Sequence, residues 1–178
     1  MYLAMTKEIV EPLSTSDFKD YFANVPDLKN HMAGIKALDE IPKTLKLKSF
    51  IIVNTSVREQ KLGHWIVIGR PQKDIVELFN SLGCDSIAPI KPYLKFPFKS
   101  EIVYNNSPVQ LATSSSCGLY CIYFAVLRYF NLDCSFEEII EDIFNSDINK
   151  NEHRVHQFCH HLLNLTQPHD LFSLNLLL

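Results

Sequence analysis

The segment from Pro108 to Phe130 constrains the fold of this chain more than any other stretch. A polar run from Thr113 to Ser116 ends at Cys117, and a mostly apolar segment then continues to Phe130. This order predicts a buried α-helix whose first turn carries the cysteine. The first backbone N–H groups of a helix have no partner within it, and the positive end of the helix dipole lies there. Both effects favour a thiolate, which is the nucleophilic form of cysteine.

Two residues near Cys117 fit the surroundings of a nucleophile. Gly118 leaves the backbone open beside the sulfur, so we expect a substrate carbonyl to approach there. Gln110 lies seven residues upstream and carries a side-chain N–H for a developing oxyanion. The alternative is a helix that begins with an unreactive cysteine, because free cysteine is often simply a small buried hydrophobe.

The composition fits one globular domain over residues 1–178, with 47% hydrophobic and 21% charged residues. A formal charge of −3 gives no overall attraction to nucleic acid or to an anionic membrane. Five cysteines without a regular pattern favour a reducing, intracellular location. Residues 119–130 are too few to span a bilayer, so we expect a soluble monomer without membrane contact. The apolar tail, residues 171–178, is expected to pack against the domain or to lie at a contact surface.

Short apolar runs predict strands in the middle of the chain and helices around them. The strands are expected at 50–54, 64–70, 75–80 and 101–104, with the second and third joined as a hairpin. The predicted class is therefore α+β.

Capping residues predict where several of the helices begin. Residues 6–33 look helical in pieces, with Ser16 as the expected cap of the first helix. Ser135 and Glu138 form a capping-box signature, and a last helix is predicted from about residue 151 to 165.

One of the seven histidines stands apart as a candidate base. His64 begins an apolar strand and is followed by Trp65, so the strand and a large aromatic side chain hold it rigidly. Asn80 ends the next strand of the hairpin, where it can accept from one imidazole nitrogen and fix the tautomer. The alternatives are a satisfied strand-edge histidine and an ordinary turn asparagine. Taken with Cys117 and Gln110, the pair suggests a thiol hydrolase in which His64 shuttles the proton.

The remaining histidines do not predict a metal site. His153, His156 and His160 recur on one side of the last predicted helix, but no HExxH motif or cysteine pair joins them. No glycine-rich phosphate loop is present either. We therefore expect no metal and no required cofactor.

Several short segments resemble the adenovirus protease (adenain) family, a branch of the clan that includes the SUMO-deconjugating proteases. The resemblance covers roughly residues 50–130 and implies a mixed central sheet flanked by helices, with the nucleophile at the N-terminus of a buried helix. The segments that carry it are IVNT (52–55), GHW (63–65), LFNSLG (78–83), VQ (109–110) and SCGLYC (116–121).

Carried over residue by residue, the resemblance assigns the parts of a cysteine endopeptidase. It makes Cys117 the nucleophile, His64 the base, Asn80 the third member and Gln110 an oxyanion donor. Trp65 becomes the indole beside the catalytic histidine, and we expect it to contact substrate together with the backbone opened by Gly118. The family usually has Glu or Asp where this chain has Asn80, although a Cys-His-Asn set works in papain-like enzymes.

The resemblance also implies a substrate class and a setting. Its members cleave after small, often glycine, residues, and adenain-like enzymes process capsid precursors inside the host cell or the virion. Adenain is stimulated by a peptide and by DNA; here the lysines at 43, 46, 48, 91, 95 and 99 form either local basic patches or solvated loop charge. The alternatives are a peptidase that removes SUMO or another ubiquitin-like modifier, and a catalytically weakened relative that only binds a partner.

Overall fold

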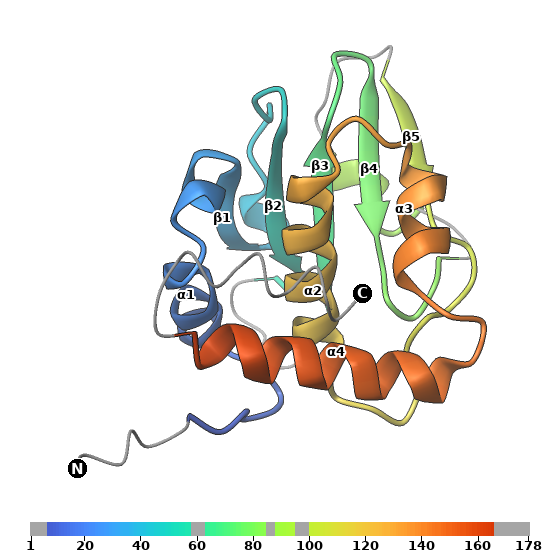
Figure 1. The fold of residues 1–178 in the computed structure, drawn as a ribbon. Coiled ribbons are helices and arrows are strands. Elements are labelled where there is room, and N and C mark those ends of the chain that lie inside the picture. Colours follow the sequence, from blue (N-terminus) through green and yellow to red (C-terminus); the bar gives the residue numbers. More distant parts are fainter. Residues whose placement is uncertain (1–6, 58–62, 85–87, 95–99, 166–178) are drawn as a thin grey trace.

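A five-stranded mixed sheet lies at the centre of the chain, with its strands in the order β1-β2-β3-β4-β5 (Figure 1). This computed structural model describes residues 7–57, 63–84, 88–94 and 100–165. The outer strands β1 and β5 run parallel to their neighbours, whereas the central strand β3 is antiparallel to both β2 and β4. The strands are β1 (Met32–Ala37), β2 (Ser49–Asn54), β3 (Trp65–Arg70), β4 (Ile75–Phe79) and β5 (Glu101–Tyr104).

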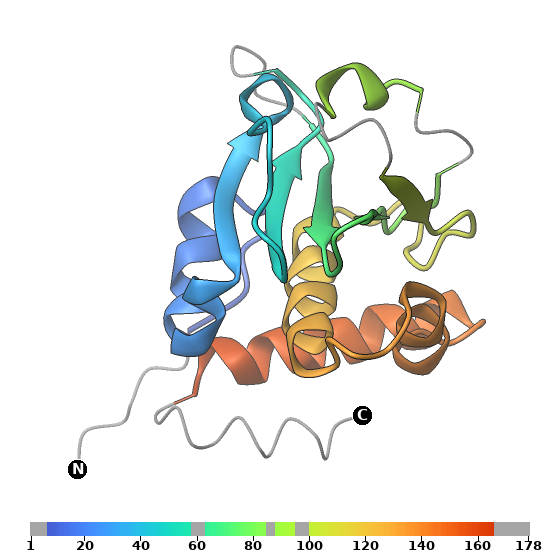
Figure 2. The same ribbon diagram turned by 90° about the horizontal axis from the view of Figure 1, so that it is seen from above.

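The α-helices gather on one face of this sheet, as the view from above shows (Figure 2). Helix α4 crosses the N-terminal end of α2, so the start of α2 lies where the sheet and two helices meet (Figure 1). Short 3₁₀ segments lie at Pro26–Asn30, Leu38–Glu40 and Lys91–Tyr93. The α-helices are α1 (Thr15–Ala23), α2 (Cys117–Phe130), α3 (Phe136–Ile143) and α4 (Ile148–Leu163).

Strand alternation divides the core into two apolar clusters, one on each face of the sheet. The helical face buries Ile52, Val67 and Phe79 against α2, whose side chains are buried from Cys117 to Arg128. The opposite face buries Ile51, Val53, Ile66, Ile68, Val76 and Leu78 beneath the connecting segments. A helix that is apolar on all sides belongs inside the protein, which explains why α2 lies between the sheet and α4.

The predicted strands and the helix predicted to begin at Cys117 match the structure closely. The hairpin of β3 and β4 is present, and β5 occupies residues 101–104 as expected. Helix α3 begins at the predicted capping box, with the Ser135 N–H bonded to the Glu138 carboxylate at 2.7 Å. The structure has the mixed sheet and flanking helices of an α+β protein. The predicted behaviour of residues 171–178 lies outside the described residues.

Three local predictions were wrong. Strand β1 was not predicted, and its first two residues lie at the end of the range 6–33 that was expected to be helical in pieces. Parallel pairing with β2 stabilises a strand whose sequence has no strong pattern of its own. Ser14 rather than Ser16 precedes α1, since Asp17 accepts the Ser14 N–H at 2.6 Å. Helix α4 starts at Ile148, where the Asp147 side chain accepts from the backbone N–H of Asn149.

A buried ion pair joins α2 to the sheet. Arg128 on α2 forms two hydrogen bonds with Glu77 on β4, from Nε to Oε2 at 3.0 Å and from Nη2 to Oε1 at 2.9 Å. Arg128 also donates to the backbone carbonyl of Asn131 just beyond the helix. These contacts fix α2 along β4, the strand that leads to Asn80.

All five cysteines lie in the described residues, and none of them forms a disulfide bond. In the part of the chain that the structure describes, we find no helix that is long and apolar enough to cross a membrane.

Candidate active site

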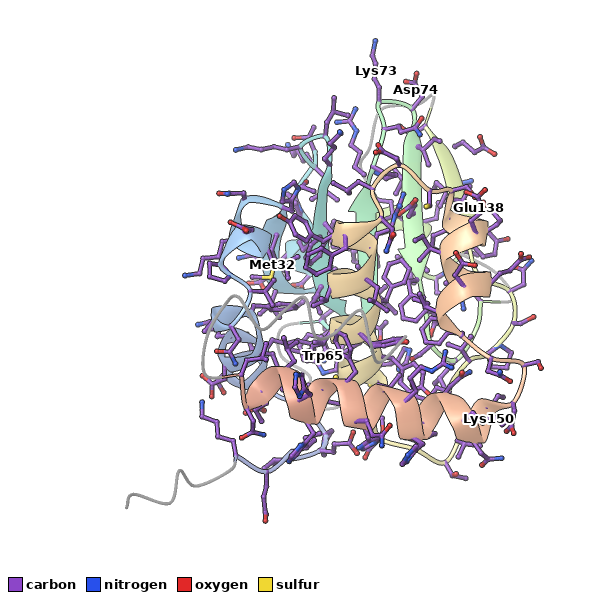
Figure 3. The ribbon with its side chains drawn as sticks, viewed as in Figure 1. Met32, Trp65, Lys73, Asp74, Glu138 and Lys150 are labelled. Atoms are coloured by element: carbon purple, nitrogen blue, oxygen red, sulfur yellow. The ribbon has the colours of Figure 1, made fainter. Side chains whose placement is uncertain are left out.

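The start of helix α2 meets the start of strand β3, and this contact brings two of the predicted residues to one place. The Cys117 thiol lies against the backbone amide of Trp65, so the sulfur is beside the peptide that joins His64 to Trp65. Figure 3 labels Trp65 near the crossing of α2 and α4. The backbone of His64 is itself fixed by Thr55, whose N–H donates to the His64 carbonyl at 2.7 Å and whose hydroxyl accepts the His64 N–H at 3.0 Å.

The His64 imidazole is hydrogen-bonded to Asn80. Its Nε2 lies 2.6 Å from Asn80 Oδ1. The Asn80 Nδ2 donates to the Gly83 carbonyl at 2.7 Å, which identifies the other terminal atom as the oxygen. Since an amide oxygen only accepts, Nε2 carries the proton of the neutral imidazole and Nδ1 is left with its lone pair. The pair therefore fixes the tautomer in which Nδ1 can act as a base.

Asn80 is held in this position by a tight turn. Its Oδ1 also accepts from the Leu82 N–H at 3.0 Å, and its carbonyl accepts from the Gly83 N–H at 2.8 Å. Gly83 has φ +76°, and a Cβ there would lie 2.6 Å from the Asn106 carbonyl oxygen, so the turn requires glycine. The side chain of Asn105, at the end of β5, holds the backbone of Asn80 from outside the turn.

Gln110 is buried near the start of α2 with its amide group held at both ends. Its Oε1 accepts from the Ser81 hydroxyl at 2.6 Å, and its Nε2 donates to the Ser114 carbonyl at 3.0 Å. Its backbone N–H donates to the Ser81 carbonyl at 3.0 Å. The structure thus connects Gln110 to the residue that follows Asn80 in the turn.

The pKa values of Cys117 and His64 are shifted in directions that disfavour a resting thiolate. Burial raises the pKa of the Cys117 thiol, although the backbone amides of Trp65, Gly118 and Cys117 itself act to lower it. The Glu11 carboxylate adds to the increase. Burial also lowers the pKa of His64, opposed by its hydrogen bond to Asn80. The amides at the helix start favour the thiolate as expected, but desolvation outweighs them and favours the neutral thiol, as it also favours the neutral imidazole of His64.

The sequence suggested that the space beside Gly118 is open. In the structure, Leu13 fills this space. A Cβ on Gly118 would lie 2.9 Å from the Leu13 Cβ, so glycine here permits close packing of the N-terminal segment. The Leu13 carbonyl accepts from the Trp65 indole Nε1 at 3.0 Å. This correction places Gly118 in a packing contact, and it makes Leu13 a wall of the site.

A groove of about 540 Å³ lies beside Trp65 and Gly63. It is lined on one side by residues 12–15 and on the other by residues 35–37 at the edge strand β1. Trp65, expected to contact substrate, lines this groove and is otherwise buried, with its ring 4.9 Å from that of Phe18.

The lysines of the predicted basic patches and the histidines of α4 lie in different surroundings. Lys43, Lys46, Lys48 and Lys91 are exposed, whereas the lysines at 95 and 99 lie outside the described residues. His156 contacts the Ser116 hydroxyl at 3.0 Å. Within the residues that the structure describes, no group of three or more His, Cys, Asp or Glu side chains is arranged to hold a metal ion.

Four residues of the site were not singled out by the sequence. Leu13, Ser81 and Asn105 each form one of the contacts described above, and Glu11 acts on Cys117 through its charge. The sequence signal for Ser81 and Asn105 is that both are polar residues following strands, β4 and β5, that pair with each other. Nothing local distinguishes Leu13 or Glu11, because their partners are distant in the chain.

Part of the chain is similar to a viral enzyme. The protein named "Protease" from Bovine adenovirus 7 is 29% identical over 93 residues, which is 44% of this chain and 46% of that protein. The chain thus spans less than half the length of this relative. No profile of a known protein family matches. The similarity supports a relationship to a protease.

Proposed function

We propose that the chain is a cysteine endopeptidase with Cys117 as its nucleophile and His64 as its base. The observation that carries this proposal is the 2.6 Å hydrogen bond between His64 Nε2 and Asn80 Oδ1, together with the position of the next residue, Trp65, whose backbone amide lies at the Cys117 sulfur. A thiol at a helix start, an imidazole of defined tautomer and a buried amide donor are the parts that thiol-dependent acyl transfer requires.

The proposed reaction starts from the neutral pair. His64 Nδ1 takes the thiol proton as the Cys117 sulfur attacks the scissile carbonyl carbon, and the resulting oxyanion accepts from Gln110 Nε2 and the Cys117 backbone N–H. The imidazolium then gives its proton to the leaving amine as the C–N bond breaks, which leaves a thioester. Water, deprotonated by the same Nδ1, hydrolyses that thioester and restores the thiol.

Asn80 has a limited electrostatic role in this scheme. Its neutral oxygen orients the imidazole but stabilises the transient imidazolium less than a carboxylate would. The low pKa of His64 agrees with this arrangement, since burial disfavours the charged ring and Asn80 offsets only part of that effect. Proton transfer during attack, rather than a stored ion pair, is therefore the proposed route.

The proposed substrate is a polypeptide that carries a small residue, such as glycine, on the acyl side of the cleaved bond. Leu13 packs against Gly118 and bonds to the Trp65 indole, so the N-terminal segment narrows the approach to the sulfur. A narrow approach favours acyl residues without a side chain. By similarity to the viral protease, we propose that the natural substrate is a precursor of a viral or virus-like capsid.

The test is hydrolysis of a fluorogenic peptide panel that varies the residue before the cleaved bond. We expect thiol-dependent cleavage after glycine, and loss of cleavage in Cys117→Ala. Cys134→Ala is the matched control, because Cys134 is a partly exposed thiol at the far end of α2. Equal activity of the two variants would remove Cys117 from the reaction.

The same preparation separates capsid processing from removal of a modifier. Incubation with SUMO and ubiquitin conjugates gives no cleavage if the enzyme acts on precursor polypeptides. Cleavage of conjugates without cleavage of peptides would instead identify a deconjugating peptidase. Repeating the peptide assay with added DNA or candidate viral peptides tests whether either one stimulates turnover.

A further inference from the structure

Ser81 forms a buried contact that ties Gln110 to the turn of the candidate site. The serine has no exposed surface, and its hydroxyl donates to Gln110 Oε1 at 2.6 Å. Its carbonyl accepts from the backbone N–H groups of Val109 at 2.8 Å and Gln110 at 3.0 Å. Main chain and side chain of Gln110 are thus held by one residue.

The Ser81 hydroxyl and the Ser114 carbonyl together set which way the Gln110 amide faces. Because the oxygen of that amide is bonded to Ser81, the nitrogen must point to the other side, where it donates to the Ser114 carbonyl at 3.0 Å. A primary amide has two N–H groups. The bond to Ser114 uses one of them, and the second is the group that the proposed function assigns to the oxyanion.

We infer that Ser81 is a positioning residue that keeps the Gln110 amide in the orientation that donates to the oxyanion. The inference rests on the proposed function. If the amide turned over, its oxygen would face the oxyanion and repel it. Since Ser81 directly follows Asn80, one turn orients both the partner of the base and the oxyanion donor.

The test compares Ser81→Ala with the unmodified full chain in three assays. We expect kcat for a glycine-directed peptide to fall about 10- to 100-fold, with KM changed less than about twofold. The affinity of a peptide aldehyde, whose adduct with the thiol carries the oxyanion, should fall by a similar factor. Alkylation of Cys117 by iodoacetamide should stay within about twofold, since displacement at a saturated carbon forms no oxyanion.

Ser49→Ala is the matched control. Ser49 is also buried, 7% exposed, and its hydroxyl donates to the Lys46 carbonyl at 2.7 Å. It pairs with Arg70, at the end of the sheet opposite the candidate site. Its loss should leave kcat and aldehyde affinity unchanged, which separates positioning from the general cost of removing a buried hydroxyl.

Two further variants keep the inference falsifiable. Ser81→Cys preserves the size of the side chain with a weaker donor, and it decides the matter if Ser81→Ala does not fold; it should lose part of kcat and of aldehyde affinity. The double variant Ser81→Ala/Gln110→Ala should have the same kcat and the same aldehyde affinity as Gln110→Ala alone.

The outcomes distinguish the inference from the proposed function. If the unmodified chain is active and the folded Ser81 variants behave like Ser49→Ala, Ser81 has no positioning role. If Gln110→Ala retains full activity, the inference also fails while the cysteine peptidase stands. If the unmodified chain shows no thiol-dependent cleavage and no aldehyde binding, both fall together.

Discussion

Asn105 holds the backbone of Asn80 with both ends of its side-chain amide. Its Oδ1 accepts from the Asn80 N–H at 2.9 Å, and its Nδ2 donates to the Asn80 carbonyl at 2.7 Å. Asn105 is 6% exposed and follows β5, which runs parallel to β4. The Asn105 side chain therefore takes the place of a further backbone pairing between β4 and β5, and it fixes the position of Asn80 just beyond β4.

Replacing Asn105 should weaken both stability and turnover. Asn105→Ala leaves the Asn80 N–H without its partner and leaves the Asn80 carbonyl with the Gly83 N–H alone, with an expected loss of about 1–3 kcal/mol in the free energy of unfolding. Urea unfolding measures this loss, and the kcat of the peptide assay should fall as well. Asn131→Ala is the control, since Asn131 also donates to a backbone carbonyl, that of Leu127, but at the far end of α2. A variant with reduced stability and full kcat would show that the contact is structural only.

Exchange of Asn80 for Asp should change the pH dependence of turnover. A carboxylate beside His64 favours the imidazolium, so the pKa of His64 should rise and the acid limb of kcat/KM should move to higher pH. The same change removes the donor that Asn80 offers to the Gly83 carbonyl, so thermal stability should fall. Asn80→Ala should lose most of kcat. An acid limb that does not move in Asn80→Asp would argue that His64 is not the group seen in the profile.

The low pKa of His64 should make the folded state sensitive to mild acid. Burial lowers the pKa of His64 from its usual value of 6.5, so the unfolded chain binds more protons between that lowered pKa and pH 6.5. Stability therefore rises with pH in this window and is lost as pH falls through it.

Urea unfolding at pH 7.5 and pH 5.5 tests this for the unmodified chain and for His64→Gln. The unmodified chain should lose more stability on acidification than the variant. Other titrating groups are common to both proteins and cancel in the difference. Equal losses would show that His64 titrates alike in the folded and unfolded chains.

The Cys117 thiol should react with alkylating agents mainly at alkaline pH. Burial, assisted by the Glu11 carboxylate, raises the pKa of Cys117 above its usual value of 9.0. The rate of iodoacetamide labelling, followed by peptide mass spectrometry, should therefore keep rising above neutral pH. Glu11→Gln should shift this rise to lower pH, whereas Glu8→Gln, an exposed neighbour, should not. A plateau of labelling already at acidic pH would instead indicate a stored thiolate–imidazolium pair.

Replacing one member of the buried Glu77–Arg128 pair should strongly reduce the free energy of unfolding. The side chains of the two residues are 4% and 9% exposed, and removal of either leaves the other charge without a partner. We expect Arg128→Met or Glu77→Gln alone to reduce the free energy of unfolding by about 3–5 kcal/mol. Replacing both by apolar residues should cost less than either single change. Strictly additive losses in urea unfolding would contradict this coupling.

Local patterns in the sequence were sufficient for much of the fold. The α2 segment was predictable because an apolar run follows a polar one, and α3 because a capping box is complete within four residues. The hairpin strands were predictable from apolar runs separated by turn residues. The edge strand β1 was not, since its conformation depends on pairing with β2, which is more distant in the chain.

The candidate site likewise has features that the sequence predicted and features that depend on the tertiary structure. The sequence by itself determined the residue types and their order, and it placed His64, Asn80 and Cys117 at the ends of secondary-structure elements. Only the tertiary structure decided that Leu13 fills the space beside Gly118, that Asn105 and Ser81 hold the turn, and that desolvation outweighs the helix amides at the sulfur. The reason is physical: periodicity and capping act between near neighbours, whereas burial and side-chain hydrogen bonds depend on segments that meet only after folding.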